Sequence, residues 1–239
     1  MAVARINTAT PVSANVGTGT FNVSVTVGAG SNRALILAVG TNQGTDSVTG
    51  VTWNGQSLSL MQSLLGTGLS MWVSFWYLLE ANLSTTTANA IVSISSATNG
   101  QAAFAYVLSG VNQSTPFSTP YTKQTVGTGN PLGAQPTMAG NVGDMYIDAY
   151  IDDNQAGNLT GAPSAGSGGG SATIVAGTPL ILNGANSRVL MGSTKVVAAT
   201  SDSMPWSLSS NPEGAWLGAT VAQAVGGPPS YYLGNDNYF

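Results

Sequence analysis

The stretch Ser70–Glu80 reads SMWVSFWYLLE and says more about the fold than any other part of the chain. Side chains of a β-strand alternate between its two faces, so Phe75 and Tyr77 lie on one side and Trp72 and Trp76 on the other. Both faces are then apolar, which is typical of a central strand that is covered on both sides. We expect a strand in the core of a β-sandwich; an aromatic platform for a sugar is the alternative for the same stripe.

The sequence around this strand shows the same two-residue alternation. Asn32–Thr41 is apolar on both faces and predicts a second central strand, whereas Gly19–Gly28 alternates apolar and polar residues and predicts a half-buried one. Asn54-Gly55 predicts a hairpin with a type I′ turn, because both residues tolerate positive φ angles. The expected strands are Gly19–Gly28, Asn32–Thr41, Val48–Trp53, Gln56–Gln62, Ser70–Glu80, Asn89–Ser96, Gln101–Leu108, Val142–Asp152, Ser171–Ala176, Ser187–Ala198 and Ala215–Val225.

The order of these strands predicts the fold class. Only Glu80–Thr87 could hold a helical turn, and Ser109–Gly140, rich in Pro and Gly, is the expected crossover between sheets. We therefore expect an all-β fold, an antiparallel, jelly-roll-like β-sandwich. The expected organisation is an N-terminal arm (1–17), a single β-sandwich domain (18–225) and an aromatic C-terminal interaction tail (226–239).

The composition excludes several functions. Only 6% of the residues are charged against 43% that are hydrophobic, so solubility depends on Ser, Thr, Asn and Gln. Five Lys+Arg and nine Asp+Glu give a net charge of −4 without a basic cluster, which argues against nucleic acid as a partner. Cys and His are both absent, which excludes disulfides and thiolate metal sites and removes the commonest general base. The sequence predicts no metal and no cofactor.

The N-terminal sequence MAVARINTATPVSANVG has no apolar stretch suited to a secretory signal, and no segment reaches the roughly 18 apolar residues of a membrane helix. We therefore expect a protein made in the cytoplasm, with no membrane partner. Uncharged strands rich in Thr, Ser and Asn are typical of particle surfaces and extracellular β modules. A virion protein released by lysis fits both observations, and an extracellular protein whose signal was trimmed is the alternative.

Several motifs occur in a familiar order along the chain. They are VTWNGQSL, WYLLEANLSTTTANAIVSIS, AYVLSGVNQSTPF and AWLGATVAQAV. Together they resemble a β-sandwich module of bacteriophage structural and environmental bacterial surface proteins, with a WNG hairpin, a WYL strand, an SGVNQ..P turn and a late W-A strand. The resemblance covers about residues 18–225 and implies one domain. It implies no agreed activity and no catalytic residues, and the aromatic C-terminal tail departs from it.

The stretch Val142–Asp152 places Asp144, Asp148 and Asp152 on one strand face, which we expect to face water while the other face joins the core. Residues four apart on a strand are separated by roughly 13 Å, whereas calcium ligands lie within about 2.6 Å of the ion. The three carboxylates therefore cannot form one site. Asp152–Asn154 could still supply oxygens to a cation, and a solvated turn is the alternative.

Catalysis is the least favoured class of function, and we expect no enzyme. A glycosidase needs two carboxylates roughly 5–10 Å apart across a cleft, and the nine acids are scattered along the chain. Without His, a Ser nucleophile would depend on Lys123 or Lys195, and neither lysine lies in a Ser-x-x-Lys motif.

Two aromatic groups are candidates for binding. Trp206 and Trp216 bracket WSLSSNPEGAW and could present a face to a glycan; the alternative places Trp216 in the core and Trp206 at a sheet edge. After Pro228-Pro229 the tail carries large apolar side chains without a burial pattern, and we expect them to contact a neighbouring subunit, with folding back onto their own domain as the alternative. These candidate contact residues are Tyr231, Tyr232, Leu233, Tyr238 and Phe239.

Taken together, these features favour a structural virion protein of a bacteriophage-like particle, a capsid decoration or other surface-exposed component. Its expected partners are copies of itself and other virion proteins. A carbohydrate-binding or adhesion module that recognises a host-surface glycan is the alternative. The expected core residues are Leu35, Leu37, Trp53, Phe75, Tyr77, Phe104, Tyr106, Ile147 and Trp216.

Overall fold

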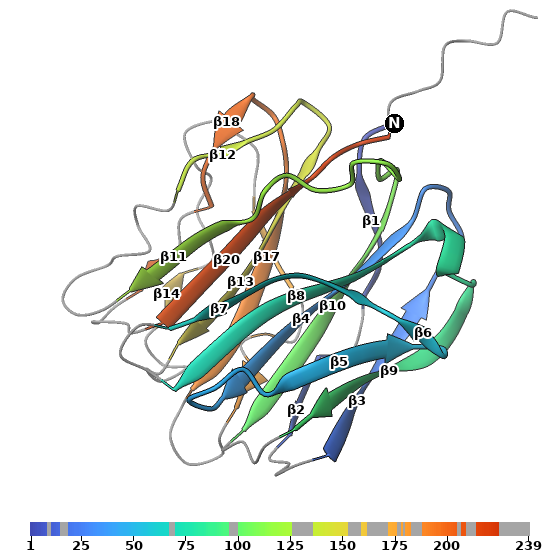
Figure 1. The fold of residues 1–239 in the computed structure, drawn as a ribbon. Helices are drawn as coiled ribbons and strands as arrows, with labels where there is room; N and C mark the ends of the chain where they lie inside the picture. The colour runs from blue at the N-terminus through green and yellow to red at the C-terminus, as the bar shows by residue number, and fades with distance from the viewer. Residues whose placement is uncertain are drawn as a thin grey trace, which may run out of the picture.

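Three antiparallel β-sheets stacked on one another make up most of the described structure (Figure 1). The computed structural model describes residues 1–8, 11–14, 19–66, 70–95, 100–125, 136–152, 159–161, 172–175, 178, 180–182, 188–204, 207–208 and 214–224. The expected all-β class and antiparallel sandwich are confirmed. Glu80–Asn82 (η1) forms a 3-10 turn, within the stretch where a helical turn was expected. Among the described residues, no helix has the length and hydrophobicity needed to cross a membrane.

The middle sheet is built on β4 (Ala34–Asn42) and β8 (Met71–Leu79), the two stretches that are apolar on both faces. The two strands pair along their whole length, beginning with Ala34 opposite Leu79. β4 is buried at every position, because alternate side chains enter the cores on opposite sides of the sheet. The strand order is β1-β10-β4-β8-β7, with β2 beside β10. The remaining strands are β1 (Ala4–Thr8), β2 (Val12–Ala14), β7 (Ser59–Leu65) and β10 (Gln101–Ser109).

The N-terminal outer sheet covers one face of the middle sheet, in the order β3-β9-β5-β6. Its turn between β5 and β6 is the predicted one, since Asn54 and Gly55 both have positive φ angles, of 48° and 77°. β6 has only two residues because the chain leaves this sheet at Leu58 and continues in the middle sheet as β7. The strands are β3 (Gly19–Val27), β5 (Val48–Trp53), β6 (Gln56–Ser57) and β9 (Thr86–Ile94).

The C-terminal outer sheet covers the other face, in the order β11-β20-β13-β17-β15, with β16 beside β17. The chain crosses to it after β10, as expected, although the predicted loop Ser109–Gly140 also contains β11 and β12. The strands are β11 (Tyr121–Thr125), β13 (Met145–Asp152), β15 (Thr173–Ile174), β16 (Leu180–Ile181), β17 (Val189–Val196) and β20 (Gly214–Val221). Two short pairs join β12 (Met138–Ala139) to β18 (Ser201–Asp202) and β14 (Leu159–Gly161) to β19 (Ser207–Leu208).

The hydrophobic residues form three clusters. One lies between the middle and C-terminal outer sheets, a second between the middle and N-terminal outer sheets, and a third on the outer side of the C-terminal outer sheet. Tyr77 is half-buried and makes an edge-on ring contact with Phe117 at 4.8 Å. The other expected core residues are confirmed: Leu35, Leu37, Trp53, Phe75, Phe104, Tyr106, Ile147 and Trp216.

The irregular arm predicted for residues 1–17 is wrong where the structure describes it. β1 and β2 both pair with β10, so this segment is part of the middle sheet. The sequence pattern did not indicate these two strands because each is short and because the register of β1 shifts between Arg5 and Asn7.

Candidate functional site

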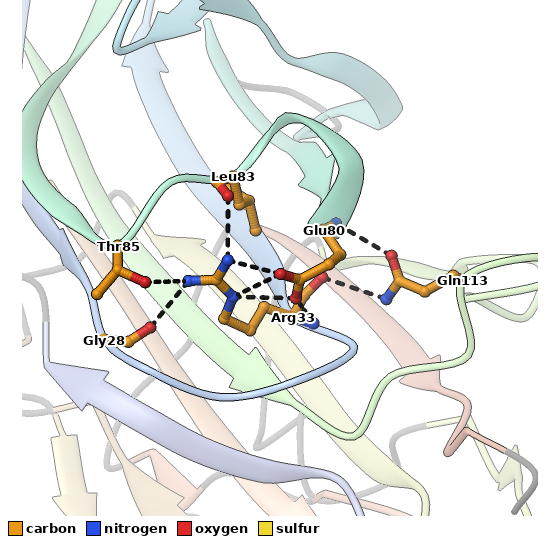
Figure 2. Close-up of polar contacts among 6 residues, drawn as sticks. All are labelled: Gly28, Arg33, Glu80, Leu83, Thr85 and Gln113. Carbon is orange, nitrogen blue, oxygen red and sulfur yellow. Dashed lines mark hydrogen bonds and ion pairs between the residues drawn. The ribbon is translucent and has the colours of Figure 1, made fainter.

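A partly buried polar cluster joins Arg33, just before β4, to Glu80, just after β8 (Figure 2). The Arg33 side chain is 7% exposed and the Glu80 side chain 33%. Nη2 of Arg33 donates to Oε1 of Glu80 at 2.6 Å and Nε donates to Oε2 at 2.9 Å, which is a two-point contact. The guanidinium also donates to the main-chain oxygens of Gly28 and Leu83 and to Oγ1 of Thr85. Arg33 therefore fastens the ends of several strands to one point.

Gln113 extends this cluster to the segment after β10. The main-chain N–H of Glu80 donates to Oε1 of Gln113 at 3.0 Å, and Nε2 of Gln113 donates to the main-chain oxygen of Arg33 (Figure 2). Nε2 of Gln113 also donates to the main-chain oxygen of Val111. Glu80 lies in the WYLLEANLSTTTANAIVSIS motif and Gln113 belongs to the SGVNQ..P motif. The two motifs thus meet in space. Arg33 was not among the predicted site residues because no local pattern marks it.

The electrostatics of this cluster keep both partners charged. The hydrogen bond with Glu80 raises the pKa of Arg33, and the same bond lowers the pKa of Glu80 below its ordinary value. A carboxylate held ionised in this way is a poor proton carrier near neutral pH. The cluster is therefore suited to holding strands together.

A second polar cluster surrounds Asp148 in β13, which is completely buried. Its Oδ1 accepts hydrogen bonds from the main-chain N–H and the hydroxyl of Ser193 at 2.7 and 2.8 Å, and its Oδ2 accepts one from Nε1 of Trp216 at 2.9 Å. The hydroxyl of Tyr106, from the middle sheet, donates to the main-chain oxygens of Asp148 and Ser193. Burial raises the pKa of Tyr106 well above its ordinary value. The cluster ties the middle sheet to the C-terminal outer sheet.

The water-facing acidic face predicted for Val142–Asp152 is wrong. Asp144, Asp148 and Asp152 are only 2%, 0% and 2% exposed. The third hydrophobic cluster, which includes Tyr146, covers this face of the C-terminal outer sheet. Asp148 is accommodated there because donors from other strands surround its carboxylate.

Lys195 and Asp202 form a third internal contact, an ion pair between β17 and β18 in which both side chains are fully buried. Tyr146 lies close to this pair: burial, and then the charge of Asp202, raise the pKa of Tyr146 to about 12. Lys195, one of the two lysines considered as a base for a Ser nucleophile, is thus bound to a carboxylate. Lys123 lies on β11, and partial burial lowers its pKa.

A surface groove lies where the described chain begins and ends. Two adjoining hollows of about 500 and 480 Å³ share Thr115, Asn141, Asp144 and Ala222 in their walls. The carboxylate of Asp144 accepts hydrogen bonds from the main-chain N–H groups of Asn141 and Gln223 at 2.7 and 2.8 Å. This carboxylate therefore shapes the loops of the groove.

Some of the remaining candidate site residues are buried, and the others lie outside the described residues. Trp216 is completely buried and hydrogen-bonded, as its core alternative predicted, so its ring does not face a glycan in solvent. Asp152 is buried, while its neighbours Asp153 and Asn154 lie outside the described residues. The described residues contain no group of three or more His, Cys, Asp or Glu that could hold a metal ion. Also outside the described residues are Trp206, Tyr231, Tyr232, Leu233, Tyr238 and Phe239.

No family model, curated protein or solved structure matches this chain.

Proposed function

We propose that this chain is a structural protein of a bacteriophage-like particle, a capsid decoration or another surface-exposed virion component, and that it acts through contacts between protein subunits. The proposal combines the resemblance of its motifs with the distribution of polar groups in the structure. Structural subunits need a stiff framework and an outer surface that can contact protein without large desolvation costs.

The observation that carries the proposal is that charged groups cross-link the interior while uncharged groups line an outer face. Arg33 and Glu80 join strand ends, and Lys195 and Asp202 form a buried pair. In contrast, the exposed side chains of β3 and the alternate, outward side chains of β9 are hydroxyls and amides together with one Ile. They are Thr20, Asn22, Ser24 and Thr26 on β3 and Thr87, Asn89, Ile91 and Ser93 on β9.

This distribution suits contacts between proteins. Uncharged hydroxyl and amide groups exchange hydrogen bonds with water for hydrogen bonds with a neighbour at little net cost, whereas a buried unpaired charge costs several kcal/mol. Copies of one chain can approach one another through such a face without repulsion between like charges.

Copy number in a purified particle tests the proposal. Particles purified by density gradient from the source that encodes the chain are analysed by quantitative mass spectrometry against a known major capsid protein. We expect a fixed ratio that corresponds to symmetry-related positions, and loss of the chain only when the particle dissociates. Absence from particles, together with saturable binding of the isolated full chain to an immobilised glycan, would replace the proposal with the carbohydrate-binding alternative.

A further inference from the structure

The edge strands of the three sheets differ in how they are protected against pairing with another chain. Natural edge strands are usually short, bulged or charged, because an unguarded edge exposes a row of main-chain N–H and C=O groups. β1 carries Arg5 and a register shift, β7 has a register shift against β8, and β11 is five residues long with Lys123 at its centre. β6 and β15 have two residues each. Each of these edges has at least one protective feature.

β3 has none of these protective features within the described structure. It is nine residues long, its sequence GTFNVSVTV contains no charge and no Pro, and it ends the sheet order β3-β9-β5-β6. Its register against β9 is unbroken from Gly19 opposite Ile94 to Val27 opposite Thr86. Every second residue of such a strand directs its main-chain N–H and C=O groups away from the sheet.

The sequence of β3 is also compatible with pairing to itself. When two copies lie antiparallel with Val23 opposite Val23, all nine residues overlap, Asn22 faces Ser24 of the second copy, and Thr20 faces Thr26. Polar side chains then meet polar ones on the exposed face, and Phe21 meets Val25 on the buried face. A shift by one residue would place exposed side chains opposite buried ones, so this register is favoured over its neighbours.

We propose that β3 pairs antiparallel with β3 of a second copy of this chain about a two-fold axis at Val23, so that two N-terminal outer sheets form one continuous sheet. The contact is isologous, as in most homodimers. It names the surface through which the proposed structural subunit meets its own copy, and in that respect it rests on the proposed function.

The contact is expected to be weak for an isolated pair. Phe21, Val23 and Val25 are at most 4% exposed before any pairing, because β1 and β2 pack residues such as Ile6 and Val12 against the same cluster. Pairing therefore adds main-chain hydrogen bonds and contacts between Thr and Asn side chains, and little apolar burial. A dissociation constant on the order of 100 µM fits such a small interface, and several copies held on one particle would strengthen it by avidity.

Register-specific cross-linking of the full chain tests the pairing directly. The chain has no Cys, so Asn22→Cys and Ser24→Cys each introduce a single thiol. In the proposed register positions 22 and 24 of opposite copies are direct neighbours, whereas equal positions lie diagonally at about 7–8 Å, too far for an unstrained disulfide. We expect oxidised covalent dimers from an equimolar mixture of the two variants, one of them size-tagged, and much less from either variant alone. The proposal would be overturned if the mixture formed no more covalent dimer than either variant alone. It would also be overturned if the folded variants formed no covalent dimer at all.

Charge variants provide an independent readout by sedimentation at concentrations up to about 1 mM, well above the expected dissociation constant. Asn22→Lys with Ser24→Lys should abolish the dimer, as should Asn22→Glu with Ser24→Glu, and mixing the two should restore it, because opposite charges then face each other. The matched control is Asn89→Lys with Ile91→Lys, on the same exposed face but on the inner strand β9; it avoids Thr87, whose hydroxyl is hydrogen-bonded to Thr26, and it should leave the dimer intact. A wild-type chain that stays monomeric, or a dimer lost only in the β9 control, would overturn the edge contact.

Dimerisation in solution does not depend on a particle, so a confirmed dimer of a chain that is absent from particles would contradict the proposed function alone.

Discussion

Asp148 shows at the scale of one residue what local sequence can and cannot predict. Alternation predicted one strand face for Asp144, Asp148 and Asp152, and the exposure predicted for that face was wrong. Its donors Ser193 and Trp216 lie 45 and 68 residues away in the chain, so no pattern within one strand could indicate them. The same holds for Arg33 and Glu80, which are 47 residues apart. Buried charges are stabilised by groups that only the fold brings together.

We predict that Asp148→Asn destabilises the protein by about 2–3 kcal/mol, because the amide loses the charge and cannot accept all the hydrogen bonds that the carboxylate accepts. Chemical denaturation of the variant and the wild type at neutral pH measures the difference. Asp46→Asn is the control, since Asp46 is exposed and accepts one hydrogen bond from the main chain of Val48. Equal, small effects at the two positions would contradict the role assigned to Asp148.

The ion pair between Glu80 and Arg33 should make the stability of the fold depend on pH in the acidic range. Because Arg33 lowers its folded-state pKa below the ordinary value of 4.5, the pair contributes stability that is fully present above pH 4.5 and is lost as pH falls through the folded pKa. Glu80→Gln should cost about 1–2 kcal/mol at pH 7, a modest amount because the side chain is partly exposed. The difference from wild type should shrink as pH falls below 4.5. A difference that is constant from pH 7 to pH 3 would show that the ion pair does not contribute.

At the scale of elements, the predictions succeeded where the signal is local. β4 and β8 were identified because both faces are apolar, and the Asn54-Gly55 turn because its chemistry is specific. β1, β2 and β11 were missed because strands of three to five residues present too few alternations. The two apolar faces of β8 indicated that other elements pack against both sides of this strand. The structure shows that these elements are two separate sheets, one on each side.

The central strand provides the test at this scale. Phe75 is completely buried between the middle and C-terminal outer sheets, and its ring packs edge-on against Tyr106 at 6.4 Å. Phe75→Ala should cost about 3–5 kcal/mol, measured as a lower melting temperature by circular dichroism. Tyr77→Ala, two residues along on the same face but half-buried, should cost clearly less. A melting temperature that Phe75→Ala leaves unchanged would contradict the packing described here.

At the scale of the whole molecule, buried tyrosines predict a sensitivity to alkali. The folded-state pKa of Tyr146 is raised from 10.0 to about 12, and that of Tyr106 is raised well above 10.0, in both cases chiefly by burial. Groups with raised folded-state pKa values contribute stability below pH 10 that is lost as pH rises through the folded values. Tyrosinate absorbance should therefore show a group of tyrosines that ionises only together with unfolding, above pH 10. If every tyrosine ionised near pH 10 while the fold persisted, the burial of these rings would be contradicted.

We propose that this three-layer sandwich is a repeated building unit of a particle. Cryo-electron microscopy of the purified particle, with averaging over its symmetry, provides a direct test. We predict density for the three stacked sheets at symmetry-related positions on the surface, each copy in contact with neighbouring subunits. Symmetric particles whose density leaves no place for the sandwich, although the source makes the chain in quantity, would contradict the claim.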